Sequence, residues 1–364
     1  MNRRQFIKTA SLSAVALALP GLVRADELPF NPLPSDGWRT FEVTTRIEPV
    51  AGTTHVWVPL PSVQDDDWVK DLGSVWRGNA DDIGPATDPA YGAQMLVGRW
   101  QSTAGPPPEL EVVSRFSVRD RAVDLNRPRQ VTPLADAERA RYTRATRLLP
   151  TNGIVLNTAL DITRNAKTDL DKARAIYDWV VDNTERNPKT RGCGLGDIRF
   201  MLETRDLTGK CADLNALYVG LARAAGLPAR DLYGIRVADS RFGYKSLGKS
   251  GDISKAQHCR AEVWLERIGW VPVDPADVRK VVLEEKPGLT LKDPIVVVVR
   301  DKLFGAWESN WLPYNTAHDL ALPGSQGPTL PFLMYPQGED GGKRLDCLDP
   351  KTFVYTITSK EITA

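Results

Sequence analysis

The run G-K-C-A-D-L-N-A-L-Y-V-G-L-A-R-A-A, residues 209–225, begins as a short polar loop and continues with leucines at helical spacing. Its alanine-rich composition also favours a helix. The G-L-P sequence at 226–228 is typical of a helix end, because glycine accepts a left-handed cap and proline cannot continue the helix. The sequence therefore predicts a helix that begins at Cys211 and ends near Ala225.

Cys211 falls in the first turn of this predicted helix. Backbone N–H groups there lack intrahelical acceptors, and the helix dipole favours an anion. A thiol in such a position has a lowered pKa and is a stronger nucleophile near neutral pH. The alternative is that Cys211 is a small buried hydrophobic residue, which is the usual role of a free cysteine.

A histidine and an aspartate downstream supply the partners that a nucleophilic thiol needs. Residues 258–266 alternate polar and apolar side chains, which predicts a strand that begins at His258. A turn at 267–269 and a return strand that ends at Asp274 complete an antiparallel hairpin. Because the midpoint between them is Glu266, we expect His258 and Asp274 to lie nearly opposite each other on one face. The alternative is a surface histidine near an unrelated aspartate.

Four motifs resemble the transglutaminase-like superfamily: G-K-C-A-D at 209–213, A-R-A-A-G-L-P-A-R at 222–230, H-C-R-A-E at 258–262 and G-W-V-P-V-D-P at 269–275. Their order and spacing make the match specific, and it covers roughly residues 135–300. The resemblance implies an α+β fold with a papain-like core and a catalytic triad of Cys211, His258 and Asp274. In such a triad the aspartate orients the imidazole, which takes the thiol proton.

The resemblance leaves the substrate open, because the family includes transglutaminases, peptidases, amidases and members without catalysis. Many members carry an aromatic residue where this chain has Arg260. We expect this difference to alter the pocket wall and to leave the triad untouched. The backbone N–H of Cys211 is the first candidate for an oxyanion donor, because it lies at a helix start, and the Gln257 side chain is the second.

The sequence predicts a thiol-dependent acyl-transfer enzyme, a cysteine peptidase or amidase, whose partner is a protein or peptide substrate, including those of the cell envelope. Hydrolysis is favoured because water is abundant and no second amine pocket is evident. The alternatives are a cross-linking transglutaminase and a catalytically silent module that binds peptides or cell wall. A redox sensor is a third alternative, with Cys193 as the thiol that resolves oxidised Cys211. No cofactor is predicted, because thiol acyl transfer needs none and no acidic cluster suggests calcium.

The chain has four cysteines. If Cys211 stays reduced, then Cys193, Cys259 and Cys347 allow at most one disulfide, whose pairing the sequence leaves open. Strand alternation turns Cys259 away from His258 into the core, so we expect Cys259 to be inert, and Cys193 could line the cleft. A Cys/His metal site is disfavoured, because no C-x-x-C motif occurs and adjacent strand residues face opposite sides.

The N-terminus carries a targeting pattern. The sequence N-R-R-Q-F-I-K at 2–8 is a twin-arginine pattern, an apolar run follows at 14–19, and V-R-A at 23–25 is typical of a signal-peptidase site. The apolar run is too short for a permanent membrane span. We therefore expect export through the twin-arginine pathway, cleavage near Ala25, and a mature protein in the periplasm with no stable membrane insertion. The alternative is a basic N-terminal anchor.

Composition sets further limits. The net charge is +1, with 42% hydrophobic and 26% charged residues, which is ordinary for a globular protein. This balance argues against nucleic acid or an anionic membrane as the main partner. We expect a monomer, with a signal peptide at 1–25, a β-sandwich domain at 26–132 and a catalytic domain at 133–303.

Two sets of patterns support this division. Residues 41–47, 55–58 and 110–118 alternate as strands do, and residues 170–183 predict a helix that opens the catalytic domain. The Ile/Val run at 295–299 predicts a buried strand.

The last segment, 304–364, is rich in Trp, Pro and Gly, and we expect it to wrap the core as irregular structure that ends in a strand at 352–358. The glycine-rich stretch at 243–251, with Lys245 and Lys249, comes just before His258. It is either a mobile loop that closes over substrate or a solvated connection, and the second interpretation is favoured.

Overall fold

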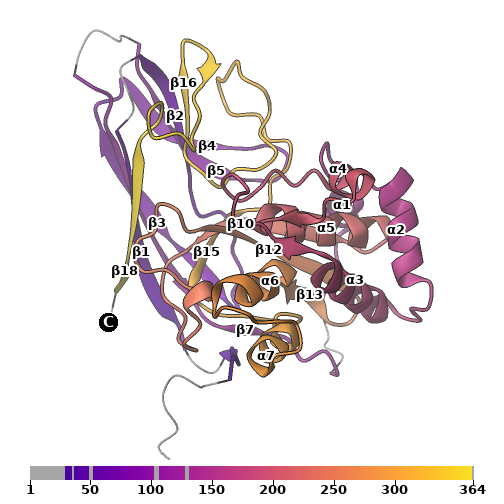
Figure 1. The fold of residues 1–364 in the computed structure, drawn as a ribbon. Helices are drawn as coiled ribbons and strands as arrows, with labels where there is room; N and C mark the ends of the chain where they lie inside the picture. Colours follow the sequence, from indigo (N-terminus) through magenta and orange to yellow (C-terminus); the bar gives the residue numbers. More distant parts are fainter. Residues whose placement is uncertain (1–28, 35–36, 49–51, 102–105, 128–130, 363–364) are drawn as a thin grey trace, which may run out of the picture.

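The computed structural model describes residues 29–34, 37–48, 52–101, 106–127 and 131–362 (Figure 1). The predicted signal peptide at 1–25, with its twin-arginine pattern, lies outside these residues. No helix in the described part of the chain is both long and apolar enough to cross a bilayer.

A sandwich of β-strands stands beside the helical part of the molecule (Figure 1). Its strands are β1 (Arg39–Ile47), β2 (Thr53–Pro59), β3 (Val69–Gly78), β4 (Asp82–Thr87), β5 (Gln94–Arg99), β6 (Leu110–Val118), β11 (Gly251–Asp252), β16 (Gln337–Asp340), β17 (Lys343–Arg344) and β18 (Tyr355–Ile362). Within the described residues one sheet has the order β11-β18-β1-β6-β3, and the other β17-β16-β2-β5-β4. Val56 of β2 and Val112 of β6 lie in one buried cluster that joins the two sheets. The predicted β-sandwich is confirmed.

The strands predicted at 41–47, 55–58 and 110–118 fall within β1, β2 and β6. Strands β3, β4 and β5 were not predicted. Both β3 and β4 are largely exposed and contain glycine, so their sequences show no alternation of buried and exposed positions.

The second half of the molecule is built on a four-stranded sheet of described residues with the order β13-β12-β10-β15. Its strands are β10 (Ala229–Arg236), β12 (Gln257–Leu265), β13 (Gly269–Val273) and β15 (Trp311–Asn315). The helices are α1 (Asp136–Thr143), α2 (Gly153–Thr163), α3 (Asp169–Asn183), α4 (Ile198–Thr204), α5 (Cys211–Ala224), α6 (Pro275–Glu284) and α7 (Pro294–Lys302), with a 3₁₀ turn at Lys245–Leu247. Short strands β7 (Arg121–Ala122), β8 (Glu185–Arg186), β9 (Thr208–Gly209) and β14 (Ala306–Trp307) form two further pairs, β14 with β7 and β8 with β9.

Helix α5 is the centre of this half. Every residue from Cys211 to Arg223 is buried, because the sheet covers one side of the helix and α2 and α3 cover others. Most of its side chains are apolar, which suits such a position, and its buried polar residues Asp213, Asn215 and Arg223 all make hydrogen bonds. The helix predicted at 211–225 and the helix predicted at 170–183 are both confirmed, and with them the α+β fold class.

The strand predicted at 295–299 is wrong, because these residues belong to helix α7. Pro294 occupies the first turn, where its fixed φ suits a helix and its missing N–H is not needed. Val296 and Val299 are buried while Val297 is 47% exposed, which is the spacing of a helix with one buried face. A short apolar run does not distinguish the two structures by periodicity alone.

The segment 304–364 does not run as irregular structure throughout, contrary to expectation. Strand β15 completes the sheet behind α5, and β16, β17 and β18 join the two sheets of the sandwich. The final strand begins at Tyr355, three residues later than predicted, and runs to Ile362. All residues of β15 are buried on both faces, so its sequence lacks the alternation that would have revealed it.

Candidate active site

Cys211 is the first residue of α5 and lines a cleft of about 830 Å³. The thiol is 3% exposed, so it lies just below the cleft surface. His258, Gln257 and Cys193 line the same cleft. The structure thus brings together the predicted nucleophile, the predicted base, the second oxyanion candidate and the loop cysteine.

The start of α5 is fixed by the carboxylate of Asp213. Its Oδ1 accepts hydrogen bonds from the backbone N–H groups of Leu195 and Gly196, both at 2.9 Å, and its Oδ2 accepts one from Lys210 at 3.0 Å. Gly194 has a φ of +96°, and a Cβ there would overlap the Asp213 carboxylate. Only glycine therefore allows this loop to lie against the helix start.

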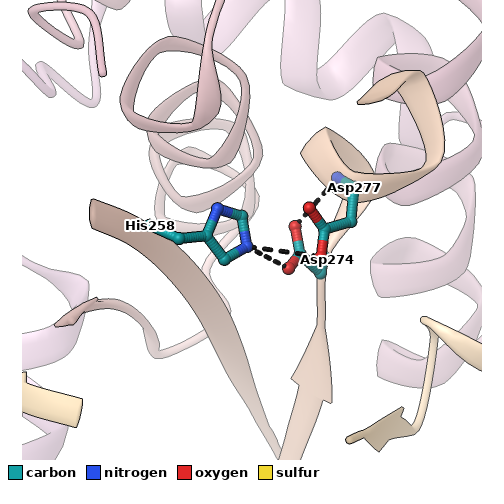
Figure 2. A group of neighbouring side chains, drawn as sticks. All are labelled: His258, Asp274 and Asp277. Carbon is teal, nitrogen blue, oxygen red and sulfur yellow. Dashed lines mark hydrogen bonds and ion pairs between the residues drawn. The ribbon is translucent and has the colours of Figure 1, made fainter. Parts of the chain in front are cut away.

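His258 and Asp274 meet as predicted on one face of the hairpin. Nε2 of His258 lies 2.7 Å from Oδ2 of Asp274, with both side chains buried (Figure 2). The register pairs Ala261 with Val273, so Asp274 lies diagonal to His258 and not directly opposite it. The turn is centred on Arg267, whose φ is +66°, one residue beyond the predicted midpoint.

A second carboxylate, which sequence reasoning missed, also faces the imidazole. Oδ2 of Asp277 lies 3.4 Å from Nε2 of His258 (Figure 2). Its Oδ1 accepts a hydrogen bond of 2.5 Å from Nη2 of Arg236. Burial raises the pKa of Asp277, but Arg236 and His258 outweigh burial and hold it well below the ordinary value. In the sequence Asp277 is merely an acidic residue in the first turn of α6, where aspartate is common.

The two carboxylates keep His258 protonated. Burial by itself lowers the pKa of the imidazole, and Arg236 lowers it further. The charges of Asp277 and Asp274 outweigh both, and the pKa of His258 is raised to about 10. The imidazole is therefore a cation at neutral pH.

The pKa of Cys211 lies well below the ordinary thiol value. The largest cause is a hydrogen bond from the thiol of Cys193, followed by one from Cys259, and the nearby His258 adds to them against the effect of burial. The Cys193 proton can also reach the carbonyl of Gln257, at 3.2 Å, but a thiolate is the stronger acceptor. Cys211 is thus held as a thiolate beside an imidazolium.

Cys259 is buried, as expected, and burial followed by contact with Cys211 raises its own pKa well above the ordinary value, as suits an unreactive thiol. Its contact with Cys211 was not predicted. The strand pattern gave the orientation of Cys259 relative to His258 but not the position of α5, which lies over this part of β12.

Two further residues hold Asp274. Nδ2 of Asn215, one turn into α5, donates to Oδ1 of Asp274 at 3.2 Å and to the carbonyl of Cys259 at 2.7 Å. Nε of Arg260 lies 3.7 Å from Oδ2 of Asp274, and its guanidinium stacks over Trp311. Arg260 therefore lies beside Asp274 and does not line the cleft, so the expectation that it alters the pocket wall is wrong.

Gln257 carries a polar group without a partner. Its Nε2 is buried and makes no hydrogen bond with any residue that the structure describes, although the side chain lines the cleft beside Cys211. A buried amide N–H without an acceptor is unfavourable unless a ligand supplies one. The group is therefore available to a carbonyl oxygen of a bound substrate.

His258, Asp274 and Asp277 also form the one group of the described part of the chain whose three ligand atoms, within 4.8 Å of one another, could hold a metal ion (Figure 2). The guanidinium of Arg236 already pairs with Asp277, and that of Arg260 lies beside Asp274. Both charges oppose a further cation, and the arrangement favours a charge network around the imidazole over a metal centre.

Replacement of Asp277 by Asn is expected to lower the pKa of His258 from about 10 by about 1–3 pH units, because one of two facing carboxylates is lost. The chain has three histidines, so their ring signals can be followed by NMR against pH and His258 assigned with His258→Gln. Protonated His258 stabilises the fold fully below its ordinary pKa of 6.5 and loses this effect as pH rises through about 10. In Asp277→Asn that loss should occur at lower pH.

The matched control is Asp161→Asn, an exposed change on α2 that should leave the titration of His258 as it is in the parent protein. Thermal unfolding of both variants separates loss of folding from loss of the charge. A His258 titration that is the same in Asp277→Asn and in the parent would show that Asp277 acts on Arg236 alone.

Comparison with known proteins agrees with this geometry. Residues 157–275 match the family model of the transglutaminase-like superfamily. A Haemophilus influenzae protein described as uncharacterized is 37% identical over 328 residues, which span 85% of this chain and 87% of that protein. The crystal structure of a "putative cysteine protease" from Cytophaga hutchinsonii shares the fold, with a TM-score of 0.50, 14% identity, and coverage of 89% of this chain and 98% of that one. The chain belongs to the transglutaminase-like superfamily.

Proposed function

We propose that this protein is a thiol-dependent acyl-transfer enzyme of the bacterial periplasm that hydrolyses peptide or amide bonds. The observation that carries the proposal is the buried His258–Asp274 contact of 2.7 Å beside a Cys211 thiol of lowered pKa at a cleft wall. Nucleophile, proton carrier and orienting carboxylate are the three groups that thiol acyl transfer requires. A module that only binds peptides has no use for a charged thiolate in its interior.

In the proposed mechanism the Cys211 sulfur attacks the carbonyl carbon of the substrate amide. The backbone N–H of Cys211 and Nε2 of Gln257 donate to the resulting oxyanion. Because Nε2 of His258 is held by Asp274, its Nδ1 protonates the leaving amine, and a thioester with Cys211 forms (Figure 2). His258 then takes a proton from water, the hydroxide attacks the thioester, and the acid leaves as the thiolate is restored.

The test of the function is cleavage of peptides from a digest of bacterial envelope proteins, read by mass spectrometry of new termini. The parent protein should release products, and Cys211→Ala and His258→Ala should each lower the rate by about a thousandfold or more. Loss of products in Cys211→Ala with retained folding assigns the reaction to this thiol. If the parent protein cleaves nothing and Cys211→Ala still rescues a deletion strain, the protein is a binding module.

Addition of hydroxylamine to the same reaction separates hydrolysis from cross-linking. A thioester that reacts mainly with water gives carboxylic acid as the dominant product. Hydroxamate as the dominant product, with negligible acid, would assign the protein as a transamidating enzyme. We favour hydrolysis because the cleft opens to solvent and water is the abundant acceptor there.

The proposed role of Gln257 as an oxyanion donor can be tested by substitution. Gln257→Ala should lower kcat for peptide cleavage by about a hundredfold, because one oxyanion donor is lost. The rate of Cys211 alkylation by iodoacetamide should stay close to that of the parent, since this reaction forms no oxyanion. A drop of less than about twofold in kcat would remove Gln257 from the mechanism.

The periplasmic location is supported by the twin-arginine pattern and by V-R-A at 23–25. Replacement of Arg3 and Arg4 by Lys should retain the full-length protein in the cytoplasm, as judged by cell fractionation. The exported parent protein should begin at Asp26 by intact mass. An exported double-lysine variant would contradict the proposed route.

A further inference from the structure

The cleft beside Cys211 is strongly basic. Among the described residues, seven Lys or Arg side chains line it, against two carboxylates. The whole chain has a net charge of only +1, so positive charge is concentrated at this cleft. A cleft lined by one sign of charge raises the local concentration of ligands of the opposite sign.

Some of these charges already have partners. Arg186 and Lys280 both contact Glu284, one of the two lining carboxylates. Arg191 contacts Asp346, and Arg236 pairs with Asp277. The charges of Arg186, Arg191, Arg236 and Lys280 are therefore partly neutralised within the protein.

Three lysines remain available. Lys210, Lys249 and Lys255 line the cleft and make no ion pair with any residue in the described part of the chain. Lys210 directly precedes Cys211, and the other two flank β11 in the segment before His258. The positive charge of Lys249 and Lys255, after hydrogen bonds from Ser254, helps to hold the pKa of Asp252, the second lining carboxylate, below its ordinary value. Lys249, in the segment at 243–251 that was expected to be a solvated connection, is exposed and lines the cleft.

One part of the cleft wall is apolar and aromatic. It comes from the C-terminal segment and includes Tyr335, Leu348, Phe353, Val354 and Tyr355. A ligand that fills the cleft contacts both these lysines and this apolar wall. Charges that come from separate elements match several separate carboxylates along an extended chain, whereas a single compact anion would need converging donors.

We propose that the substrate is an acidic peptide, with carboxylate side chains on both sides of the attacked bond and an apolar side chain against the wall of Tyr335 and Phe353. This inference rests on the proposed function, since it names the substrate class of the same site. The free lysines attract the peptide and hold its register, and the buried triad acts on the amide between the acidic residues.

Binding can be tested without catalysis in the Cys211→Ala protein by isothermal titration calorimetry. The probes are a short peptide with glutamates on both sides of a central leucine, and its glutamine and lysine counterparts. The glutamate peptide should bind at least about tenfold more tightly than the glutamine peptide, and the advantage should shrink as salt rises from about 0.05 to about 0.5 M. The lysine peptide should bind most weakly.

The matched variants are Lys249→Glu and Lys255→Glu, with Lys245→Glu as control. All three lysines are exposed, so folding should be retained, but Lys245 does not line the cleft. Each cleft variant should weaken binding of the glutamate peptide by about threefold or more, and the control should leave it as in the parent. Equal affinity for the glutamate and glutamine peptides, or an equal effect of the control, would overturn the proposal. Displacement of the peptide by inorganic phosphate at low concentration would instead assign these charges to a phosphate.

Cleavage by the parent protein separates the two proposals. If glutamate peptides bind to Cys211→Ala but the parent cleaves none of them, the hydrolase proposal fails and the preference for acidic peptides stands. If the parent cleaves glutamate and glutamine peptides with equal kcat/KM, the preference fails and the hydrolase proposal stands.

Discussion

Two carboxylates share one imidazole in an interior that excludes water, and the candidate site depends on that arrangement. Burial alone would lower the pKa of His258, and a neutral imidazole would remove the contribution that His258 adds, after the hydrogen bonds from Cys193 and Cys259, to the lowered pKa of Cys211. Asp274 and Asp277 instead raise the pKa of His258, and Arg236 keeps the Asp277 carboxylate ionised. Buried charges are stable only when each has partners in good geometry, so the surrounding strand and helix ends must be rigid.

Charge acts at two scales in this protein. The buried groups around His258 interact over a few ångströms in a medium of low polarity, and they set which atom carries a proton. The lysines of the cleft act through water, over longer distances and subject to screening by salt. They favour the approach of negatively charged ligands. The two sets are adjacent in sequence at Lys210 and Cys211. Lys210 belongs to the lysines of the cleft, and Cys211 begins a buried helix and belongs to the groups around His258.

The sequence predicted what short-range patterns encode. Leucine spacing predicted α5, and alternation predicted the hairpin that brings His258 and Asp274 together. The family resemblance added Cys211 to them as the third residue of a triad. It did not predict Asp277, whose importance depends on Arg236, 41 residues earlier in the chain. The position of Arg260 depends on Trp311, and the apolar wall depends on residues beyond 334, so neither follows from local periodicity. Helix α7 was missed because a short valine run suits a strand and a buried helix face equally.

Strand β18 pairs with β1 along its length, and Arg39 and Glu361 at its end are 322 residues apart in sequence. The same strand pairs with β11, in the segment that carries Lys249 and Lys255. During synthesis β1 therefore emerges long before the neighbour that covers its edge, and the sandwich closes only after the catalytic half has been made. An open edge of this kind invites pairing between chains. Folding of this protein is thus a late event, and a nascent chain stalled before Tyr355 would be prone to aggregate.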